Sequence, residues 1–305
     1  MTPAAHDTTV STRDTIIEMF RHASIEITVH DRAAVPACRE ALGEGRAVYI
    51  THLRGRSPRE MVAAAVELRR AGMVPVPHIA ARHLTSFAEL ADCLARAAGE
   101  AAVDHALVIG GDRDHPAGPY GDSLQVLATG LFEKYGFRAI GLGAYPEPHP
   151  RISASVLESM LRAKIALVRQ SGMRAEIVTQ FCFDAGPILG WLQQAAKQGL
   201  DAPVRIGLAG PASIATLAKF AVRCGVGASL LALLGGQTSI ARLMVESGPE
   251  RVVRALAEAR PDALAQGMHL FSFGGVAKTA GWMRAVAAGE FSLAPDEPGF
   301  HVSRR

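Results

Sequence analysis

The sequence predicts a single (β/α)8 barrel, and two observations carry that prediction. Short apolar runs alternate with amphipathic helical runs, and eight such units fit into 305 residues. The strand candidates are continuously apolar, which is typical of parallel strands covered by helices on both faces. A doubly wound open sheet is the competing architecture, but no GxGxxG motif follows the first strand. The length and the eightfold alternation favour the barrel.

The expected elements follow one another in a regular order. An arm at 1–23 carries a helical run near 14–22, the barrel fills 24–290, and a tail occupies 291–305. The expected strands are 25–30, 47–53, 74–80, 105–111, 139–145, 176–182, 204–210 and 267–273. The expected helices are 58–72, 86–100, 123–136, 152–171, 185–199, 213–225 and 279–290, with a helical insertion up to about 260 before the last strand.

Composition excludes several classes of partner. The net charge is +3, and no Lys/Arg run or basic patch with interleaved aromatic residues is present, so no nucleic acid is expected. The apolar stretch 227–236 is too short to span a bilayer, and no apolar signal core precedes the first helix. Four scattered cysteines without a CxxC motif predict reduced thiols. We therefore expect a cytoplasmic protein that acts on a small molecule, and a homo-oligomer is compatible with this composition.

Polar and glycine residues gather where the expected strands end. In a barrel the active site lies at the carboxyl ends of the strands. The residues at these ends are Glu26 (within the first strand), Thr51, His52, His78, Gly110, Gly111, Asp112, Tyr145, Glu147, His149, Gln180, the stretch 207–210, Phe273, Gly274, Gly275 and Lys278. This convergence predicts a ligand site at that end of the barrel.

Glu26 is the carboxylate with the most specific setting, because its strand is otherwise apolar or small. If it points into the barrel, burial raises its pKa and suits it to general acid catalysis. If it points outward, it is a salt-bridge partner. The cluster around Asp112 has metal-ligating residue types, but its spacing matches no compact motif, and we predict no metal site. Of five lysines only Lys278 closely follows a strand, and no GxSxG is present, so chemistry carried by a cofactor is expected.

Six motifs, in this order, resemble the methylenetetrahydrofolate reductase family: SIEI, VYIT, PHIAAR, GGD, AYPEPHP and TQFCFD. The resemblance covers roughly residues 14–290. It implies a barrel that binds FAD and interconverts 5,10-methylene- and 5-methyltetrahydrofolate, with NADH or NADPH as the reductant.

The resemblance also implies roles for individual residues. Glu26 would be the general acid that helps to open the five-membered ring of the substrate, Asp112 would lie near flavin and pterin, and Gln180 would hydrogen-bond the pterin. The implied cofactor contacts are Thr51, His78, Gly111, Asp112, Tyr120, Gly121, Tyr145, His149, Arg162 and Lys164. Ile214 and Lys278 would contact the substrate, at or near positions where the family has phenylalanine and arginine.

The chain departs from the family pattern mainly on the cofactor side. Gly110 stands where the family has an arginine that contacts flavin, and the helix 152–171 carries a few extra residues. Two alternatives therefore stay open. One is a related folate-dependent barrel oxidoreductase without flavin, and the other is a non-catalytic subunit that binds folate or flavin.

Overall fold

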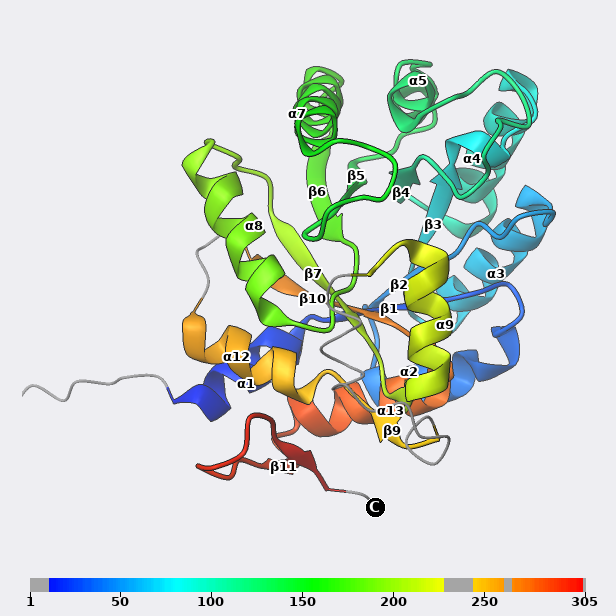
Figure 1. Ribbon diagram of the computed structural model, residues 1–305. Helices are drawn as coiled ribbons and strands as arrows, with labels where there is room; N and C mark the ends of the chain where they lie inside the picture. Colours follow the sequence, from blue (N-terminus) through cyan, green and yellow to red (C-terminus); the bar gives the residue numbers. More distant parts are fainter. Residues whose placement is uncertain (1–10, 228–243, 261–264, 304–305) are drawn as a thin grey trace, which may run out of the picture.

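Eight parallel strands close into a barrel in the computed structural model, which describes residues 11–227, 244–260 and 265–303 (Figure 1). Each strand pairs with its neighbour in the chain, and the last pairs with the first. The barrel strands are β1 (Ser24–Ile27), β2 (Ala47–Ile50), β3 (Val74–Ala80), β4 (His105–Ile109), β5 (Ala139–Ala144), β6 (Arg174–Thr179), β7 (Val204–Ala209) and β10 (Ala265–Phe271). The predicted (β/α)8 barrel is confirmed.

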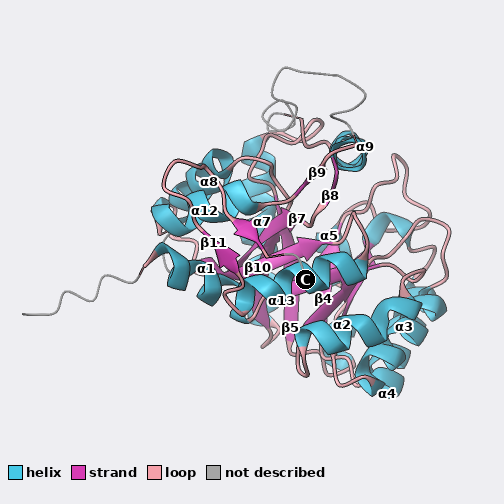
Figure 2. Ribbon diagram, turned by 90° about the horizontal axis from the view of Figure 1, so that it is seen from below, coloured by secondary structure: helices cyan, strands magenta, loops and turns pink. Residues whose placement is uncertain are grey.

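Helices surround the barrel, as the view from below shows (Figure 2). They are α1 (Thr12–Arg21), α2 (Val35–Leu42), α3 (Pro58–Arg70), α4 (Phe87–Ala101), α5 (Ser123–Leu127), α6 (Leu131–Lys134), α7 (Ala154–Gln170), α8 (Ala185–Lys197), α9 (Ile214–Cys224), α12 (Glu250–Ala259) and α13 (Val276–Ala287), with 3-10 turns η1 (Arg32–Ala34) and η2 (Ala81–His83). Among the described helices, none is long and apolar enough to cross a membrane.

Two of the expected elements have other bounds in the structure. The first strand ends at Ile27, because the backbone N–H and hydroxyl of Thr28 both donate to the carboxylate of Asp31 and turn the chain. The helix expected at 123–136 is two short helices, α5 and α6. It breaks where the hydroxyl of Thr129 donates to the carbonyl of Val126.

The described part of the expected helical insertion, residues 244–260, contains a strand as well as a helix. Residues 228–243 lie outside the described residues. Beyond them, β9 (Glu246–Ser247) pairs antiparallel with β8 (Ala212–Ser213), and α12 follows. In the expected tail, β11 (Phe291–Ser292) and β12 (His301–Val302) form a small antiparallel pair.

Side-chain caps begin most helices directly after the strand-end loops. The residues whose side chains accept a backbone N–H of the first turn are Ser11, Ser57, Ser86, Asp122, Ser153, Asp184 and Ser213. Such caps satisfy N–H groups that have no partner within the helix. They fix where each loop at the carboxyl end of the barrel must stop.

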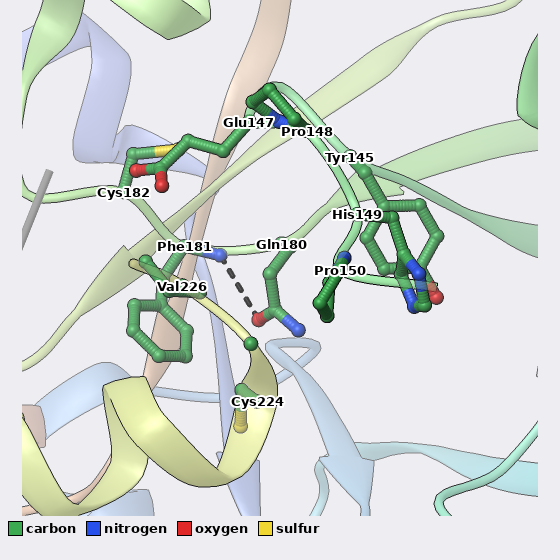
Figure 3. Close-up of a pocket in the computed structure, with 11 residues that line it drawn as sticks. Tyr145, Glu147, Pro148, His149, Pro150, Gln180, Phe181, Cys182, Cys224 and Val226 are labelled. Carbon is green, nitrogen blue, oxygen red and sulfur yellow. Dashed lines mark hydrogen bonds between the residues drawn. The ribbon is translucent and has the colours of Figure 1, made fainter. Parts of the chain in front are cut away.

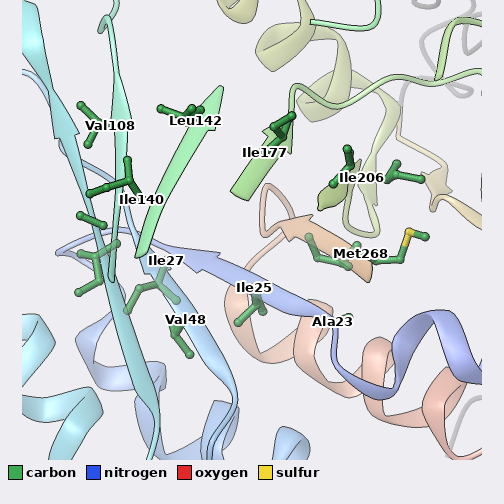
Figure 4. Close-up of a cluster of buried hydrophobic side chains, with 14 of the residues drawn as sticks. Ala23, Ile25, Ile27, Val48, Val108, Ile140, Leu142, Ile177, Ile206 and Met268 are labelled. Carbon is green, nitrogen blue, oxygen red and sulfur yellow. The ribbon is translucent and has the colours of Figure 1, made fainter. Parts of the chain in front are cut away.

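The main hydrophobic core lies between the barrel and the helices. Apolar side chains on the outer face of the strands, such as Ile25, Val48 and Ile140, are fully buried (Figure 4). At the amino end of the barrel, α1 packs on α13, where the ring of Phe20 meets Trp282 edge-on at 5.2 Å. The polar inward face of the strands is thereby left as the place for chemistry.

Gly207 of β7 makes room inside the barrel mouth. A Cβ added there would lie 2.1 Å from the carbonyl oxygen of Thr179 and 2.9 Å from the ring of Phe271. Both distances are too short for any side chain, so the small residue lets an aromatic ring lie across the inside of the barrel.

Gly207→Ala should therefore lower the free energy of unfolding by about 3 kcal/mol, since overpacking a rigid interior forces backbone shifts. The matched control is Gly190→Ala in α8, where an added Cβ meets nothing within 4 Å. That change should raise stability by up to about 1 kcal/mol through helix propensity. Urea unfolding of both variants measures the two effects. Equal midpoints would contradict the tight packing at Gly207.

Candidate active site

Glu26 points into the barrel mouth and is surrounded by polar groups. The hydroxyl of Thr51 donates to its Oε1 at 2.8 Å. Its Oε2 lies 3.6 Å from Nε2 of His78 and 3.5 Å from Nε2 of His269. Only 14% of the Glu26 side chain is exposed. The structure thus brings two predicted site residues, Thr51 and His78, to the Glu26 carboxylate, which faces inward and not outward.

His269 and Ser24 complete this cluster, and the sequence analysis missed both. Nδ1 of His269 lies 2.9 Å from the hydroxyl oxygen of Ser24, and both residues are fully buried. They are register neighbours on β1 and β10. Closure of a barrel places the last strand beside the first, and Glu26 and Ser24 share one face of β1. That closure was the signal that could have found His269.

The environment of Glu26 reverses one expectation. Burial disfavours the charged carboxylate, but His78, His269 and the Thr51 hydroxyl outweigh it, so the pKa of Glu26 lies below its ordinary value. The expected upward shift is wrong for the free protein, because sequence alone does not show these partners. Burial also lowers the pKa of His78 to about 4, so this imidazole is neutral at pH 7. The free site therefore holds a carboxylate facing a neutral histidine.

A second buried polar cluster lies in the barrel beside the Glu26 cluster. The hydroxyl of Tyr49 donates to Oε1 of Glu176 at 2.8 Å, and Nε of Arg205 lies 3.0 Å from the same oxygen. Burial disfavours ionisation, but Arg205 outweighs it and holds the pKa of Glu176 below its ordinary value. The ring of Tyr49 lies 4.6 Å from that of His269 and 6.0 Å from that of His78. The ion pair therefore anchors a tyrosine that supports both imidazoles.

Asp112 belongs to a separate, cationic group. Its carboxylate lies 2.8 Å from Nε2 of His83, 3.8 Å from Nε of Arg54 and 3.6 Å from Nη2 of Arg223. Burial alone would raise the pKa of Asp112, but the hydrogen bond from His83 and the charges around the carboxylate outweigh burial. The pKa of Asp112 therefore lies below its ordinary value. A Cβ at Gly111 would lie 3.2 Å from the His83 ring. The predicted turn thus ties Asp112 to η2, to the loop after β2 and to α9.

Tyr145, His149 and Gln180 form a third group around a small cavity (Figure 3). The rings of Tyr145 and His149 meet edge-on at 5.0 Å, and the Gln180 side-chain oxygen accepts the N–H of Phe181 at 3.1 Å. The amide nitrogen of Gln180 is then the donor that can serve a ligand. The cavity holds about 10 Å³, room for about one water molecule.

The other predicted contacts are used within the protein. Tyr120 is 6% exposed. Gly121 accepts from Nε of Arg82 at 2.8 Å. Lys164 Nζ lies 3.4 Å from the Ser123 hydroxyl on α5, whereas Arg162 donates to the Gln198 carbonyl beyond α8 at 2.9 Å. Ile214 is buried at the start of α9, and Lys278 forms an ion pair with Glu246.

FAD, which the resemblance implies, does not fit the small cavity at Gln180. Sites for molecules of that size measure about 300–1,000 Å³, whereas the cavity at Gln180 holds about 10 Å³. A Cβ at Gly225 would lie 2.8 Å from Pro150, so the end of α9 closes against the loop after β5. Two of the implied contacts are already engaged: Thr51 is bound to Glu26, and Asp112 is paired with His83, Arg54 and Arg223.

A larger groove of about 410 Å³ lies between α7 and α8. Four implied cofactor contacts line it: Tyr145, His149, Arg162 and Lys164. Glu26, Asp112 and Gln180 are not among its lining residues.

A comparison of the chain with models of known protein families finds no match. The relation to the methylenetetrahydrofolate reductase family is therefore a resemblance carried by the six motifs, now placed at the mouth of an observed barrel.

The buried histidines predict a pH dependence of stability. Burial lowers the pKa of His52 and of His78 to about 4, against about 6.5 in an unfolded chain. As pH falls, the unfolded chain binds these protons first. The neutral histidines therefore contribute their full stabilisation above about pH 6.5. As the pH falls from about 6.5 to 4, the free energy of unfolding should decrease by up to about 3 kcal/mol for each histidine.

His52→Leu should reduce the slope of unfolding free energy against pH by about one proton in this window, whatever its effect on stability at pH 7. Urea unfolding at half-unit pH intervals measures the slope. An unchanged slope would show that His52 does not titrate with a lowered pKa.

Proposed function

We propose that this chain is an oxidoreductase that interconverts 5,10-methylene- and 5-methyltetrahydrofolate with hydride from NADH or NADPH. The observation that carries the proposal is the Glu26 carboxylate in the barrel mouth, held by Thr51, His78 and His269. The motif resemblance assigns the general acid to this position. We propose the cytoplasm as its location and the folate as its small-molecule partner; a homo-oligomer stays a prediction.

The reaction needs one proton and one hydride. Protonation of N10 opens the five-membered ring, the C–N10 bond breaks, and the resulting iminium carbon accepts hydride, which leaves 5-methyltetrahydrofolate and NAD(P)⁺. Protonated Glu26 gives its proton to N10. Because the free carboxylate has a lowered pKa, it must take up that proton when substrate excludes water. His269, 3.5 Å from Oε2 and 2.9 Å from Ser24, is placed to return it.

Two further groups act on binding and orientation. The Gln180 side-chain amide nitrogen can donate to the pterin, since its oxygen already accepts from Phe181. Arg54 and Arg223 lie half-exposed beside Asp112 and offer positive charge to the carboxylates of the folate tail or to dinucleotide phosphates. The dense set of partners around Glu26 favours turnover over the non-catalytic subunit, because a subunit that only binds needs no general acid.

Two routes for the hydride were expected from the sequence, one through FAD and one direct. Thr51 is bound to Glu26, and Asp112 is paired with His83, Arg54 and Arg223, so two of the implied flavin contacts are already engaged, which supports direct transfer from NAD(P)H better. Direct transfer requires the dinucleotide ring and the folate ring to lie together at Glu26.

We therefore expect the purified protein to lack the flavin absorption band near about 450 nm. NAD(P)H deuterated at the transferred C4 position should place its label in the methyl product without loss to water. A reduced flavin would instead exchange the label at N5 with solvent. If the protein contains a bound flavin and the label is lost to water, hydride transfer passes through FAD and direct transfer is wrong.

Glu26→Gln should reduce turnover of methylenetetrahydrofolate by about 10²–10⁴-fold, since a general acid is removed without a change in size. The Kd for 5-methyltetrahydrofolate, measured by calorimetry, should change less than about threefold. Glu67→Gln, which removes a surface carboxylate paired with Arg32, serves as the matched control. If Glu26→Gln keeps turnover within tenfold of the wild type, Glu26 is not the general acid of the reaction.

A further inference from the structure

Three phenylalanine rings form a nearly parallel stack at the barrel mouth. Phe271 ends β10, Phe273 follows it, and Phe220 lies on α9. The ring centres of Phe220 and Phe273 are 4.1 Å apart with planes 13° from parallel. Those of Phe273 and Phe271 are 5.6 Å apart at 21°. All three side chains are partly exposed.

Phe271 is the member of the stack beside the catalytic carboxylate. It is the register neighbour of Glu26 across β1 and β10. Its ring edge lies 2.9 Å from where a Cβ of Gly207 would stand, and the same point is 3.1 Å from the backbone carbonyl carbon of Gln180. The Phe271 ring therefore lies near the backbone of Gln180, on the strand that is paired with the strand of Glu26.

The stack is held rigidly from behind. Phe181 is fully buried and presents its ring edge-on to Phe271 at 5.5 Å and to Phe273 at 5.0 Å. The hydroxyl of Ser272, between the two stacked rings in sequence, donates to the backbone carbonyl of Glu26 at 2.5 Å. An aromatic surface fixed in this way offers a flat face at little entropic cost to a ligand ring.

We propose that Phe271 is the surface on which the pterin ring of the substrate stacks, with Phe273 and Phe220 as its support. This inference rests on the proposed function. A pterin is flat and aromatic, and its edges carry hydrogen-bonding groups that suit the polar side chains of Glu26 and Gln180 at the barrel mouth. Ile214, the position where the resemblance implies an aromatic contact, is buried at the start of α9. The stack supplies the aromatic surface from other elements.

The experiment compares binding of 5-methyltetrahydrofolate, p-aminobenzoylglutamate and NADPH or NADH by calorimetry. Phe271→Leu should raise the Kd for 5-methyltetrahydrofolate about tenfold, as loss of ring stacking does in other aromatic sites. The Kd for p-aminobenzoylglutamate, which has no pterin, and for the dinucleotide should change less than twofold. Phe271→Tyr should keep wild-type affinity. Phe183→Leu removes a ring that contacts Phe181 in the same cluster and serves as the control.

A second measurement uses the wild-type protein and does not depend on whether the leucine variant folds. In protein deuterated except at phenylalanine rings, NMR cross-relaxation should join pterin protons of bound 5-methyltetrahydrofolate to phenylalanine ring protons, and Phe271→Tyr should remove it.

Four results would overturn the proposal. An equal loss of affinity in Phe183→Leu would make the cluster merely structural. Unchanged folate affinity in Phe271→Leu, or a loss confined to the dinucleotide, would show that pterin does not stack there. Absence of the cross-relaxation would do the same. Failure of wild-type protein to bind any folate would overturn the proposed function itself, and the stacking with it.

Discussion

The Glu26 carboxylate inside a closed barrel is the constraint on which the rest of the mouth depends. A carboxylate taken out of water is costly unless charges or hydrogen bonds compensate it. Here Thr51, His78 and His269 compensate it from three different strands. Thr51 follows β2, which pairs directly with β1, whereas His269 reaches Glu26 only because barrel closure places β10 beside β1. No single sequence motif contains the whole site; the site forms when the barrel brings residues from separate strands together.

The second buried cluster explains how the two imidazoles stay in place. Glu176 and Arg205 neutralise one another inside the barrel, and Tyr49 is bound to that pair through its hydroxyl. Its ring then contacts both imidazoles by their edges. A buried ion pair contributes little net stability after desolvation. Its value here lies in orientation, because a fixed tyrosine fixes the rings that face Glu26.

Sequence reasoning predicted the barrel and the end of it that carries the site, because both follow from local periodicity. It singled out Glu26 from the apolar strand around it and left open whether the carboxylate faces inward or outward. It did not predict His269, since that partner comes from the opposite end of the chain and meets Glu26 only on closure. The sign of the Glu26 pKa shift failed for the same reason: burial can be inferred from a strand, but compensating neighbours cannot. Lys278 was expected near folate, yet it lies on α13 and pairs with Glu246.

Helix α9 unites three groups that are otherwise separate. Phe220 joins the aromatic stack, Arg223 reaches Asp112, and Cys224 lines the small cavity beside Gln180. The spacing of these residues, three and four apart, places them on one face of a helix. A ligand that entered between Glu26 and Gln180 would therefore contact this one face. Since the face carries an aromatic ring and a cation together, it suits a molecule with a flat ring and an anionic tail. A folate has both a flat pterin ring and an anionic glutamate tail. Helix α9 therefore connects the proposed stacking of the pterin with the proposed binding of the tail.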